Sequence, residues 1–360
     1  MKEEVRLMKG NEAVAHAAIR YGCDGYFGYP ITPQSEVLET LEALMPWETT
    51  GMVVLQAESE VAAVNMVYGG AATGKAVMTS SSSPGISLMQ EGISYMAGAM
   101  LPALFINVMR GGPGLGTIQP SQADYFQATK GGGHGDYHLI VLSPSSVQEM
   151  VDFVGLGFDL SFKYRTPAMI LADGIVGQMM EKVVLPTPRP RRTDEQIKQQ
   201  CPWAVTGREG LRKRNVVTSL ELESSRMEII NHRLQDIYSE IKKNEIRWEE
   251  TDVDGADYLF VAFGTVARIC HKAKEIAAEE GIKVGILRPI TLWPFPYEAI
   301  EKAAQGKKGI LCVELNAGQM IEDVRLAVHD NLPVKHFGRL GGIIPSPQEV
   351  VDALKEKLMN

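Results

Sequence analysis

Strand–loop–helix units follow one another through the first half of this chain. Apolar runs at 25–29, 52–55, 76–79, 102–109 and 168–171 predict strands, and helical patterns separate them. Parallel strands need helical crossovers of this kind, whereas antiparallel strands can be joined by tight turns. The repeat therefore predicts an α/β fold, in which a parallel sheet carries helices on both faces and closes near Val184.

A second α/β pattern begins near Ala256. Strands are predicted at 258–263, 283–287, 310–314 and 334–337, with a helix at 266–280. The chain has 360 residues, and at roughly 100–200 residues per domain two domains are expected. We therefore predict a first domain at 1–185, a linker with an amphipathic helix at 186–254, and a second domain at 255–360.

The predicted linker has two parts. Its start alternates prolines with Arg189, Arg191 and Arg192, which indicates a stiff and solvated connection. A charged amphipathic segment follows at 220–247. Such a helix usually packs on its own chain, so this is the favoured interpretation, and contact with another subunit is the alternative. The apolar stripe consists of Met227, Ile230, Leu234 and Ile237.

The charge balance argues against nucleic acid as the main partner. The net charge is −8, from 36 basic and 44 acidic side chains, and the sequence has no extended basic stripe. The phosphate backbone of a nucleic acid is negatively charged, so the proteins that bind it usually carry positively charged surfaces. The longest apolar stretch, near 99–109, contains Pro102 and is much shorter than the ~20 residues needed to span a bilayer. We therefore expect no membrane partner.

Four cysteines lie far apart in the sequence, at Cys23, Cys201, Cys270 and Cys312. Because the sequence has no Cys-x-x-Cys pair, we expect this chain to hold neither an iron–sulfur cluster nor a structural zinc by itself, and we predict no metal ligands. Dispersed cysteines in a chain of this size are typical of the reducing cytoplasm. The charged start, MKEEVRLMKG, does not resemble a signal peptide.

The stretch 51–74, GMVVLQAESEVAAVNMVYGGAATG, contains a candidate site. The run 52–55 is predicted to be a buried strand that ends beside Glu58 and Glu60, and a helix follows. A carboxylate at the carboxyl end of a parallel strand is well placed to bind a ligand and costly to leave unpaired. The alternative is a glutamate that only complements the helix dipole. Small residues favour a ligand, because a flat ring could lie against them. They are Ala62, Ala63, Gly69 and Gly70.

Two further candidates follow predicted strands. Thr32, in the turn Tyr29-Pro30-Ile31-Thr32-Pro33, is a natural N-cap for a helix with Pro33 at its first position, and its hydroxyl could also reach a ligand. Arg110 ends an apolar strand and enters a loop with glycines at 111, 112, 114 and 116. Its planar guanidinium suits a substrate carboxylate, although an internal acid could pair with it instead.

His134 stands among glycines in the segment Gly131-Gly132-Gly133-His134-Gly135-Asp136. It has few neighbours to pack against, so it is either exposed or directed at a ligand, and a structural role is favoured over catalysis. In the second domain a polar cluster follows a predicted strand and indicates turn and packing roles. Its members are Glu314, Asn316, Gly318 and Gln319.

The order of these motifs resembles the alpha subunit of 2-oxoacid:ferredoxin oxidoreductases over nearly the whole chain. The segments are MKGNEAVAHAA (8–18), YFGYPITPQSEVLE (26–39), QAESEVAAVNMVYGGAATG (56–74), SSSPGISLMQEGISYMAGAMLPALFINVMRGGPGLG (81–116) and KGGGHGDY (130–137). The resemblance implies a thiamine-diphosphate (ThDP) binding fold, with a pyrimidine-binding domain and then a transketolase C-terminal-like domain. One departure is Ser81-Ser82-Ser83, where relatives often have threonine-serine-glycine.

The resemblance also implies roles for five residues. Glu60 matches the glutamate that contacts the aminopyrimidine ring of the cofactor, and Arg110 matches an arginine that contacts the substrate carboxylate. Thr32 matches a residue near the carboxylate and keto group of the substrate. Tyr29 and Pro30, in the same motif, are implied to lie beside the cofactor.

Half of the implied cofactor site would lie on other chains. The diphosphate is usually held through a cation by a Gly-Asp-Gly motif and a downstream asparagine. This chain has only Ala172-Asp173-Gly174 without a suitably placed asparagine, so Asp173 is interpreted as a loop residue. Magnesium would need carboxylates from a partner. The implied partners are a diphosphate-binding beta subunit, a gamma-type subunit, a ferredoxin-like delta subunit with [4Fe-4S] clusters, and ferredoxin, in a hetero-oligomer that could itself dimerise.

Within this family the sequence is most similar to the branched-chain enzymes, which act on 3-methyl-2-oxobutanoate. The implied reaction is oxidative decarboxylation of this 2-oxoacid to acyl-CoA, with coenzyme A as co-substrate and ferredoxin as electron acceptor. Alternatives stay open: an enzyme for 2-oxoglutarate or aryl 2-oxoacids, a non-catalytic scaffold subunit, or a non-redox ThDP lyase or transferase. A 2-oxoglutarate enzyme would need an extra cation for the distal carboxylate.

Overall fold

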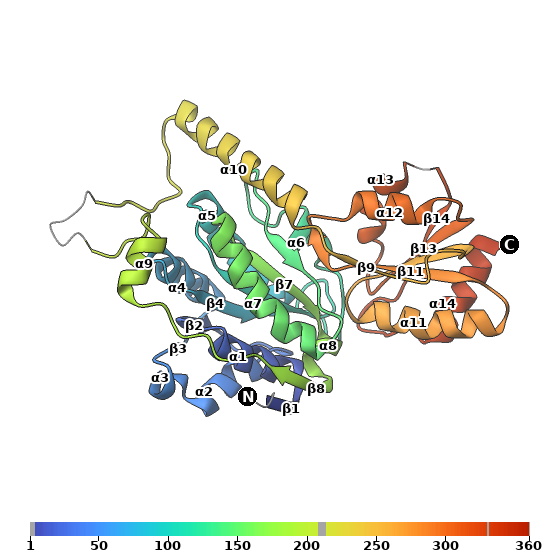
Figure 1. Ribbon diagram of the computed structural model, residues 1–360, viewed down its shortest axis with the longest axis horizontal. Coiled ribbons are helices and arrows are strands. Elements are labelled where there is room, and N and C mark those ends of the chain that lie inside the picture. Colours follow the sequence, from blue (N-terminus) through green and yellow to red (C-terminus); the bar gives the residue numbers. More distant parts are fainter. Residues whose placement is uncertain (1–3, 208–213, 330, 360) are drawn as a thin grey trace.

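The computed structural model describes residues 4–207, 214–329 and 331–359, and these form three β-sheets (Figure 1). A seven-stranded sheet lies in the N-terminal part and a five-stranded sheet in the C-terminal part. The third is a two-stranded ribbon at the side of the first. The strand orders are β12-β6-β7-β5-β4-β2-β3, β14-β13-β10-β11-β9 and β1-β8. The predicted α/β class is confirmed.

The large sheet is parallel except for its last strand, β12, which runs antiparallel to β6. Its central strands are buried at every position, as expected for strands covered by helices on both faces. The strands are β2 (Gly25–Gly28), β3 (Val53–Gln56), β4 (Val77–Ser81), β5 (Leu104–Met109), β6 (Ile140–Leu142), β7 (Ala168–Asp173) and β12 (Thr291–Trp293).

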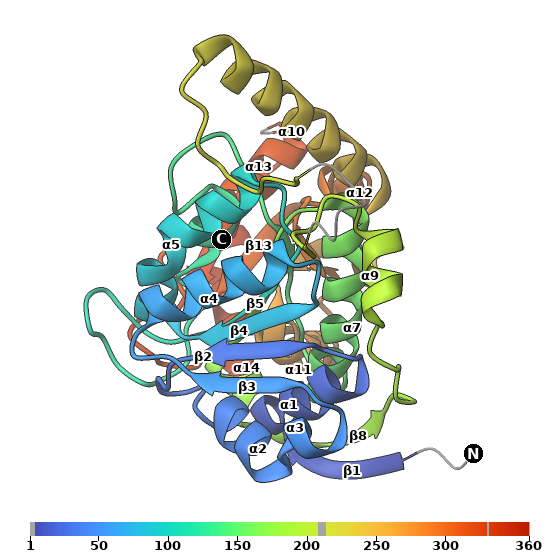
Figure 2. The same cartoon turned by 90° about the vertical axis from the view of Figure 1, so that its left-hand side faces the viewer.

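Helices cover both faces of this sheet, as predicted. Two of them, α4 (Glu60–Ala72) and α5 (Ser83–Gly98), pack side by side on one face, whereas α1 (Gly10–Arg20) and α7 (Val147–Tyr164) pack together on the other (Figure 2). Shorter helices fill the connections. They are α2 (Glu36–Leu44), α3 (Pro46–Thr49), α6 (Tyr125–Thr129), α8 (Gly174–Gln178) and α9 (Asp194–Gln200).

The predicted buried strand at 52–55 is wrong in one respect. A strand is present as β3, but it is the last strand in the sheet order, so one of its edges pairs with no other strand of the described residues (Figure 2). Val53 is 49% exposed and Leu55 is 41% exposed. The apolar run that indicated burial therefore marks an open edge of the sheet.

The helix predicted to begin at Thr32 and Pro33 begins at Glu36 instead. The carbonyl of Pro33 accepts hydrogen bonds from the side-chain amides of Asn11 and Gln178, and both amides also bind the Glu36 carboxylate. These contacts hold the segment before Glu36 in a turn. Thr32 is thus an exposed turn residue and the prediction that it caps the helix is wrong.

The two-stranded ribbon was not predicted. It pairs β1 (Glu4–Lys9) with β8 (Met180–Leu185) in antiparallel register, from Glu4 opposite Leu185 to Lys9 opposite Met180. Its outer face is exposed, because Leu7 and Met180 are more than half accessible. The short mixed sequence of β1 contains no signal of its distant partner.

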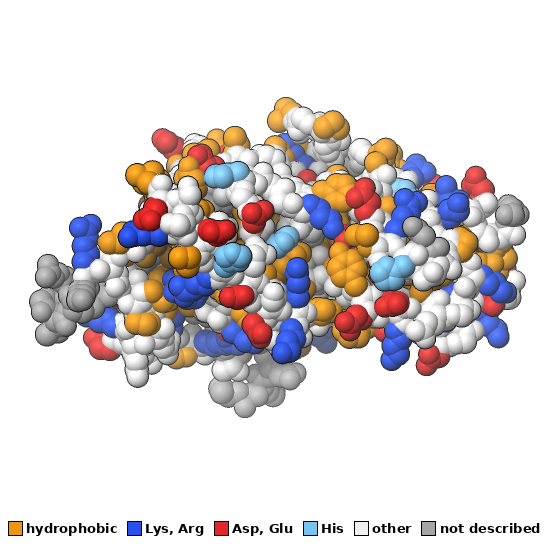
Figure 3. All heavy atoms as spheres, turned by 90° about the horizontal axis from the view of Figure 1, so that it is seen from above, with side chains coloured by type: hydrophobic (Ala, Val, Ile, Leu, Met, Phe, Trp, Pro, Cys, Tyr) orange, Lys and Arg blue, Asp and Glu red, His pale blue; other side chains and the backbone are white. Residues whose placement is uncertain are grey.

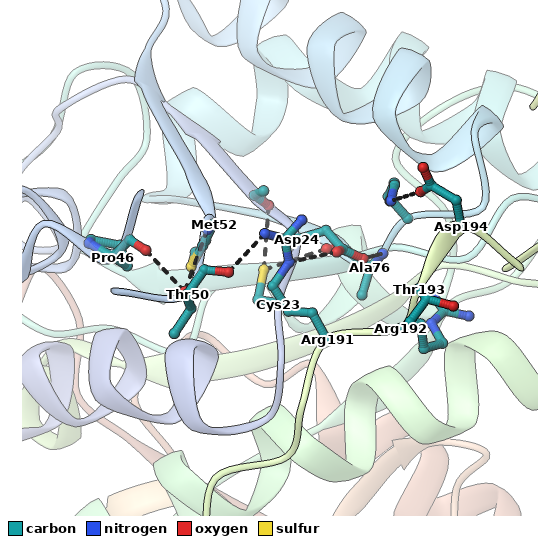
Figure 4. A network of polar contacts seen from close by, with 12 residues as sticks. Cys23, Asp24, Pro46, Thr50, Met52, Ala76, Arg191, Arg192, Thr193 and Asp194 are labelled. Atoms are coloured by element: carbon teal, nitrogen blue, oxygen red, sulfur yellow. Dashed lines mark hydrogen bonds and ion pairs between the residues drawn. The ribbon is translucent and has the colours of Figure 1, made fainter. Parts of the chain in front are cut away.

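The arginines at the start of the linker are not simply solvated (Figure 4). The Arg191 Nε lies 2.8 Å from Asp24 Oδ1, and its Nη1 donates to the Thr50 carbonyl at 2.9 Å. Arg192 Nη2 donates to the Gly74 carbonyl at 2.8 Å. Because Asp24 is buried and also accepts the amide of Ala76, these contacts tie the linker to the ends of the sheet strands.

The amphipathic helix of the linker is α10 (Ser224–Asn244), which lies along the top of the molecule in Figure 1. Leu234, Tyr238 and Ile241 are buried, so its C-terminal half packs on its own chain as favoured by the sequence. Tyr238 meets Trp293 edge to face at 5.5 Å between ring centroids. On the face seen in Figure 3, acidic and basic side chains are interspersed.

The C-terminal sheet is parallel except for β9, and helices flank it. Its strands are β9 (Trp248–Thr251), β10 (Tyr258–Val261), β11 (Val284–Pro289), β13 (Gly309–Glu314) and β14 (Val334–Gly338). Its helices are α11 (Gly264–Glu279), α12 (Tyr297–Ala304), α13 (Met320–Val328) and α14 (Pro347–Leu354), and the short π-helix Lys355–Met359 follows. No helix in the described residues is long and apolar enough to cross a membrane.

The two parts of the chain are joined by shared structure. β12, from the C-terminal half of the sequence, completes the large sheet beside β6. Arg288 is buried between Glu149 of α7 and Glu249 of β9, at 2.6 and 2.9 Å. The segment boundaries after 185 and after 254 remain our proposal, and the tight junction means that a site can draw side chains from both parts.

Candidate active site

The candidate residues lie where β2, β3, β4 and β5 end. Because these strands are parallel, their carboxyl ends share one edge of the sheet, which is where ligands bind in open α/β sheets. Thr32 follows β2, Glu60 begins the helix after β3, and Arg110 directly follows β5. The structure therefore places the three predicted residues on the same edge.

Glu60 is the first residue of α4, where Ser59 caps the helix by accepting the Ala62 amide at 3.2 Å. Its side chain is 6% exposed. Within the described chain, its carboxylate takes part in no hydrogen bond or ion pair. Glu58, two residues earlier, is exposed. A buried carboxylate without a partner is costly, so Glu60 rather than Glu58 has the character of a ligand-binding group.

Two of the four small residues singled out in α4, Ala63 and Gly70, serve close packing rather than leave room for a ring. Ala63 is fully buried, and a Cβ atom on Gly70 would come within 2.9 Å of Val77. On α5, a Cβ atom on Gly92 would come within 2.6 Å of Val64. Of the two glycines in α4, only Gly69 faces open space.

The start of α5 lies directly against Glu60. A Cβ atom on Gly85 would lie 2.8 Å from Glu60 Oε1 and 2.1 Å from Ser81 Oγ, so a larger residue there would have to displace both side chains. The hydroxyl oxygens of Ser81 and Ser82 are buried and have no hydrogen-bond partner among the residues that the structure describes. This part of the site thus combines an unpartnered carboxylate, two unpartnered hydroxyls and a helix N-terminus.

Arg110 is 7% exposed and pairs with no acidic side chain in the described structure. Its Nη1 donates to the Thr32 carbonyl at 2.9 Å, and its Nη2 donates to the Leu115 carbonyl at 3.0 Å. Its Nε is buried and has no partner. The internal acid considered from the sequence is therefore not its partner here, and a buried guanidinium without an anion is suited to bind one.

A polar network fixes the backbone beside Arg110. Ser83 Oγ accepts the Arg110 amide at 3.1 Å and donates to Asp124 Oδ2 at 2.5 Å. Asn107 donates to the same carboxylate oxygen at 2.9 Å and accepts the Ser83 amide at 3.1 Å. Burial raises the pKa of Asp124, while the bonds from Ser83 and Asn107 oppose the rise. The network joins the end of β5 to the start of α5.

Thr32, Tyr29 and Pro30 belong to the turn after β2. Thr32 touches the site through its carbonyl, which Arg110 holds, while its side chain is exposed. Gln34 donates to the Tyr29 carbonyl at 3.2 Å and accepts from Ser80 at 2.5 Å, so the turn is fixed to β4. Tyr29 is half-buried and Pro30 is exposed.

A cavity of about 670 Å³ opens beside Arg110 and is lined from both parts of the chain. The N-terminal part contributes the start of α5, the glycine loop 111–114 and residues 121, 123 and 124. The C-terminal part contributes residues 315–317, 319, 340 and 341. Among the described residues that line it, Arg110 is the one cation and Asp124 the one carboxylate.

Hydrogen bonds clamp the two sides of this cavity together. Gln122 donates its amide to the Leu315 carbonyl at 3.0 Å and accepts the Leu315 amide at 3.1 Å. Gln319 accepts the Phe126 amide at 2.8 Å and donates to the Ala123 carbonyl at 2.8 Å. The cluster after β13, which the sequence indicated as turn and packing, therefore also builds the wall of the site.

His134 lies away from this cavity. Its side chain is exposed, and its carbonyl accepts from Ser94 at 2.8 Å. Ser94 is 11 residues beyond Ser83 on α5, or about 16 Å along the helix. Its neighbour Gly133 lies close to the Gln90 backbone, where a Cβ atom would come within 2.7 Å. The structural interpretation of this glycine segment is therefore favoured.

Asp173 is not a loop residue, and that interpretation is wrong. It ends β7, caps α8 through the amides of Ile175 and Val176, and is 1% exposed. Its Oδ2 accepts the Thr265 hydroxyl at 2.7 Å and lies 3.4 Å from Gln122 Nε2. Burial raises its pKa against these bonds. Both oxygens are engaged inside the protein.

Sequence reasoning missed Ser83, Asp124, Asn107 and the wall from the C-terminal part. Asn107 lies within an apolar strand and Asp124 in an irregular segment, so neither belongs to a periodic pattern. The run Ser81-Ser82-Ser83 was noted, but only the fold shows that Ser83 bonds to the backbone of Arg110.

Comparisons with known proteins bear on the family and the fold of this chain. A family model described as "Pyruvate flavodoxin/ferredoxin oxidoreductase, thiamine diP-bdg" matches residues 16–245, and one described as "Pyruvate:ferredoxin oxidoreductase core domain II" matches residues 256–350. Ketoisovalerate oxidoreductase subunit VorB of Methanothermobacter thermautotrophicus is 48% identical over 98% of this chain and 97% of its own.

More distant relatives cover the chain as fully. 2-Oxoglutarate synthase subunit KorA of Archaeoglobus fulgidus is 35% identical over 99% of this chain and all of its own. The solved 2-oxoglutarate:ferredoxin oxidoreductase from Magnetococcus marinus, with 2-oxoglutarate, coenzyme A and succinyl-CoA bound, has a TM-score of 0.85 and 27% identity. That match covers 99% of this chain, which spans 66% of the solved one.

Proposed function

Because the chain belongs to the 2-oxoacid:ferredoxin oxidoreductase family, we propose that it is the pyrimidine-binding catalytic subunit of a branched-chain 2-oxoacid enzyme. The family resemblance and the ThDP-binding fold expected from the sequence are thereby confirmed. The proposed reaction is oxidative decarboxylation of 3-methyl-2-oxobutanoate to acyl-CoA, with ferredoxin as electron acceptor. It rests on the 48% identical relative, a ketoisovalerate oxidoreductase subunit, and on the cation beside the cavity.

We propose that Glu60 binds the aminopyrimidine ring of the cofactor. A buried carboxylate without a partner, the free hydroxyls of Ser81 and Ser82, and a glycine at 85 leave polar atoms for a ring that brings its own donors and acceptors. When bound, thiamine diphosphate supplies the nucleophilic carbon that attacks the keto group. Glu60 would hold the proton shared with the pyrimidine ring nitrogen. Tyr29 and Pro30 are proposed to lie beside the cofactor.

Arg110 is proposed to bind the substrate carboxylate. Its guanidinium is desolvated and lacks an anion, and a 2-oxoacid carboxylate would accept from it. Thr32 helps by fixing that guanidinium through its carbonyl. The cavity offers no second cation among its described lining residues, and Asp124 would repel a distal carboxylate. This favours an aliphatic 2-oxoacid over 2-oxoglutarate.

Magnesium, the diphosphate contacts and the [4Fe-4S] clusters are proposed to lie on partner chains. Both carboxylate oxygens of Asp173, the aspartate of the Ala-Asp-Gly sequence, accept hydrogen bonds from this chain. The four cysteines are buried and unpaired. The engaged oxygens of Asp173 support a separate beta subunit that holds the diphosphate, and the buried cysteines support iron–sulfur clusters on other chains. We propose that these other chains are gamma-type and ferredoxin-like delta subunits, with ferredoxin as electron acceptor. Buried free thiols also support a cytoplasmic location.

The outer face of α4 and α5 is the proposed contact with the beta subunit. It adjoins Glu60 and carries exposed apolar side chains, which are Val61, Met66, Leu88 and Tyr95. If the pyrimidine ring of the cofactor binds at Glu60 and the beta subunit holds the diphosphate of the same cofactor, the beta subunit must come close to Glu60. This face is the proposed place for that contact. Exposed apolar clusters of this kind mark protein interfaces.

Placing a charge on this face is expected to prevent assembly. Val61→Glu combined with Leu88→Glu should reduce the yield of complex with the beta subunit at least about tenfold, because charges would be buried at the interface. Size-exclusion chromatography of the co-expressed subunits measures the yield. Leu326→Glu, at a position on α13 that is 60% exposed, is the matched control. Equal assembly of the double variant and the control would contradict the assignment.

The reaction itself is tested with the purified complex. It should reduce ferredoxin with 3-methyl-2-oxobutanoate and coenzyme A, and the value of kcat/KM with 2-oxoglutarate should be at least about tenfold lower. Higher kcat/KM with 2-oxoglutarate would replace the substrate assignment. Turnover of a 2-oxoacid without iron absorbance in the complex would instead indicate a non-redox ThDP enzyme.

A further inference from the structure

We propose that Leu340, on a loop of the C-terminal part, contacts the side chain of the 2-oxoacid and sets the substrate selectivity of the complex. The inference rests on the proposed function, since it takes the cavity beside Arg110 as the substrate site. Leu340 lines that cavity, and its side chain is 59% exposed. A large apolar side chain left accessible on a cavity wall can be covered by an apolar part of a ligand.

The loop that carries Leu340 packs against the glycine loop that follows Arg110. A Cβ atom on Gly111 would lie 3.3 Å from the Gly341 carbonyl carbon and 3.3 Å from the Gly342 amide nitrogen. A Cβ atom on Gly342 would lie 2.2 Å from the Cβ of Gln119. The two backbones therefore touch where side chains would hold them apart, and Leu340 is placed one residue from this contact.

The geometry of the loop fixes the position of Leu340. Gly341 and Gly342 have φ values of 64° and 93°, which glycine adopts without strain. The Leu340 carbonyl accepts the Ile343 amide at 3.3 Å, and Arg339 pairs with Glu349 at the start of α14. The loop is thus anchored before and after Leu340, so this side chain is presented on a defined turn.

The chemistry of the cavity walls points to an uncharged side chain in the substrate. Three apolar residues of the C-terminal part line the cavity, namely Leu315, Ala317 and Leu340. Pro113, in the glycine loop, lines it from the other part of the chain. Asn316 and Gln319 also line the cavity from the C-terminal part, but their side-chain amides already donate to the Gln122 and Ala123 carbonyls. If Arg110 holds the carboxylate, the substrate side chain can therefore meet this aliphatic carbon. An isopropyl group would bury apolar surface there, whereas a second carboxylate would lose water without gaining a partner.

A cation placed at position 340 tests this directly. Leu340→Arg in the assembled complex should raise the ratio of kcat/KM for 2-oxoglutarate over 3-methyl-2-oxobutanoate about tenfold or more, because the guanidinium would pair with the distal carboxylate. Steady-state ferredoxin reduction with each acid gives the ratio. Leu340→Met should leave the ratio within about twofold of the wild type, since size and polarity are kept.

The matched control is Ile343→Arg, which adds the same charge to the same loop at a position that is 51% exposed and does not line the cavity. Its ratio should stay near that of the wild type. An unchanged ratio in a folded Leu340→Arg complex, or an equal rise in both arginine variants, would overturn the inference. If the wild-type complex uses neither acid, the proposed function fails, whereas normal use of 3-methyl-2-oxobutanoate with an unshifted Leu340→Arg ratio defeats this inference alone.

Discussion

Replacing Glu60 by glutamine is expected to lower the turnover number of the assembled complex by at least about 100-fold while the complex still forms. Glutamine keeps the shape of glutamate but cannot hold the shared proton, and a positioned acid–base group contributes about 10²- to 10⁴-fold. Because Glu60 is buried without a partner, the neutral amide should not destabilise the fold. Ferredoxin reduction with saturating 2-oxoacid and coenzyme A measures the loss.

The neighbouring glutamate provides the control for this experiment. Glu58 is exposed two residues away, so Glu58→Gln should keep normal turnover. The ThDP retained by each complex after desalting gives a second readout, which should fall for Glu60→Gln because a hydrogen bond to the ring is weakened. Near-normal activity of Glu60→Gln would support the scaffold alternative or move the acid to another residue.

Arg110→Ala is expected to lower kcat/KM for the 2-oxoacid by about 100-fold or more. The substrate carboxylate would enter a desolvated site without its cation, and truncating one partner of a buried charged pair typically costs about 2–5 kcal/mol. Arg110→Lys should recover part of the loss, since lysine keeps the charge but cannot reproduce the planar pair of donors. The KM for coenzyme A should not change.

A surface arginine separates this effect from loss of charge in general. Arg189 pairs with Asp159, and both side chains are at least half exposed, so Arg189→Ala should leave kcat/KM unchanged. Thermal unfolding of each complex shows whether the fold is kept. If Arg110→Ala binds the 2-oxoacid as tightly as the wild type in a folded complex, the carboxylate must be held by another residue.

Much of the site could be predicted because parallel strands bring their carboxyl ends together. Thr32, Glu60 and Arg110 are 78 residues apart at the extremes, yet each follows a strand of one parallel sheet, so the strand pattern alone places them on one edge. The choice between Glu58 and Glu60 required burial, which the sequence does not contain. Whether these residues carry the proposed roles stays a prediction.

The parts of the fold and of the site that were not predicted depend on contacts between segments that are far apart in the sequence. The pairing of β12 with β6 and the clamp between Gln122 and Leu315 join residues that are about 150 to 190 apart in the chain, and local patterns carry no trace of them. The turn at Thr32 followed its bonds to α1 and α8 rather than its capping propensity. The exposed position of β3 follows from strand order, which periodicity does not give.

The open edge of β3 has a consequence for how a cell must produce this protein. The open edge of β3, where Val53 and Leu55 are accessible, can pair with the edge of another copy, and the apolar face of α4 and α5 adds to the tendency to aggregate. A chain made without a partner is therefore expected to aggregate or to be degraded. If the proposed beta subunit covers the face of α4 and α5, the β3 edge is still left as a route to self-association, so the concentration of free chain must stay low.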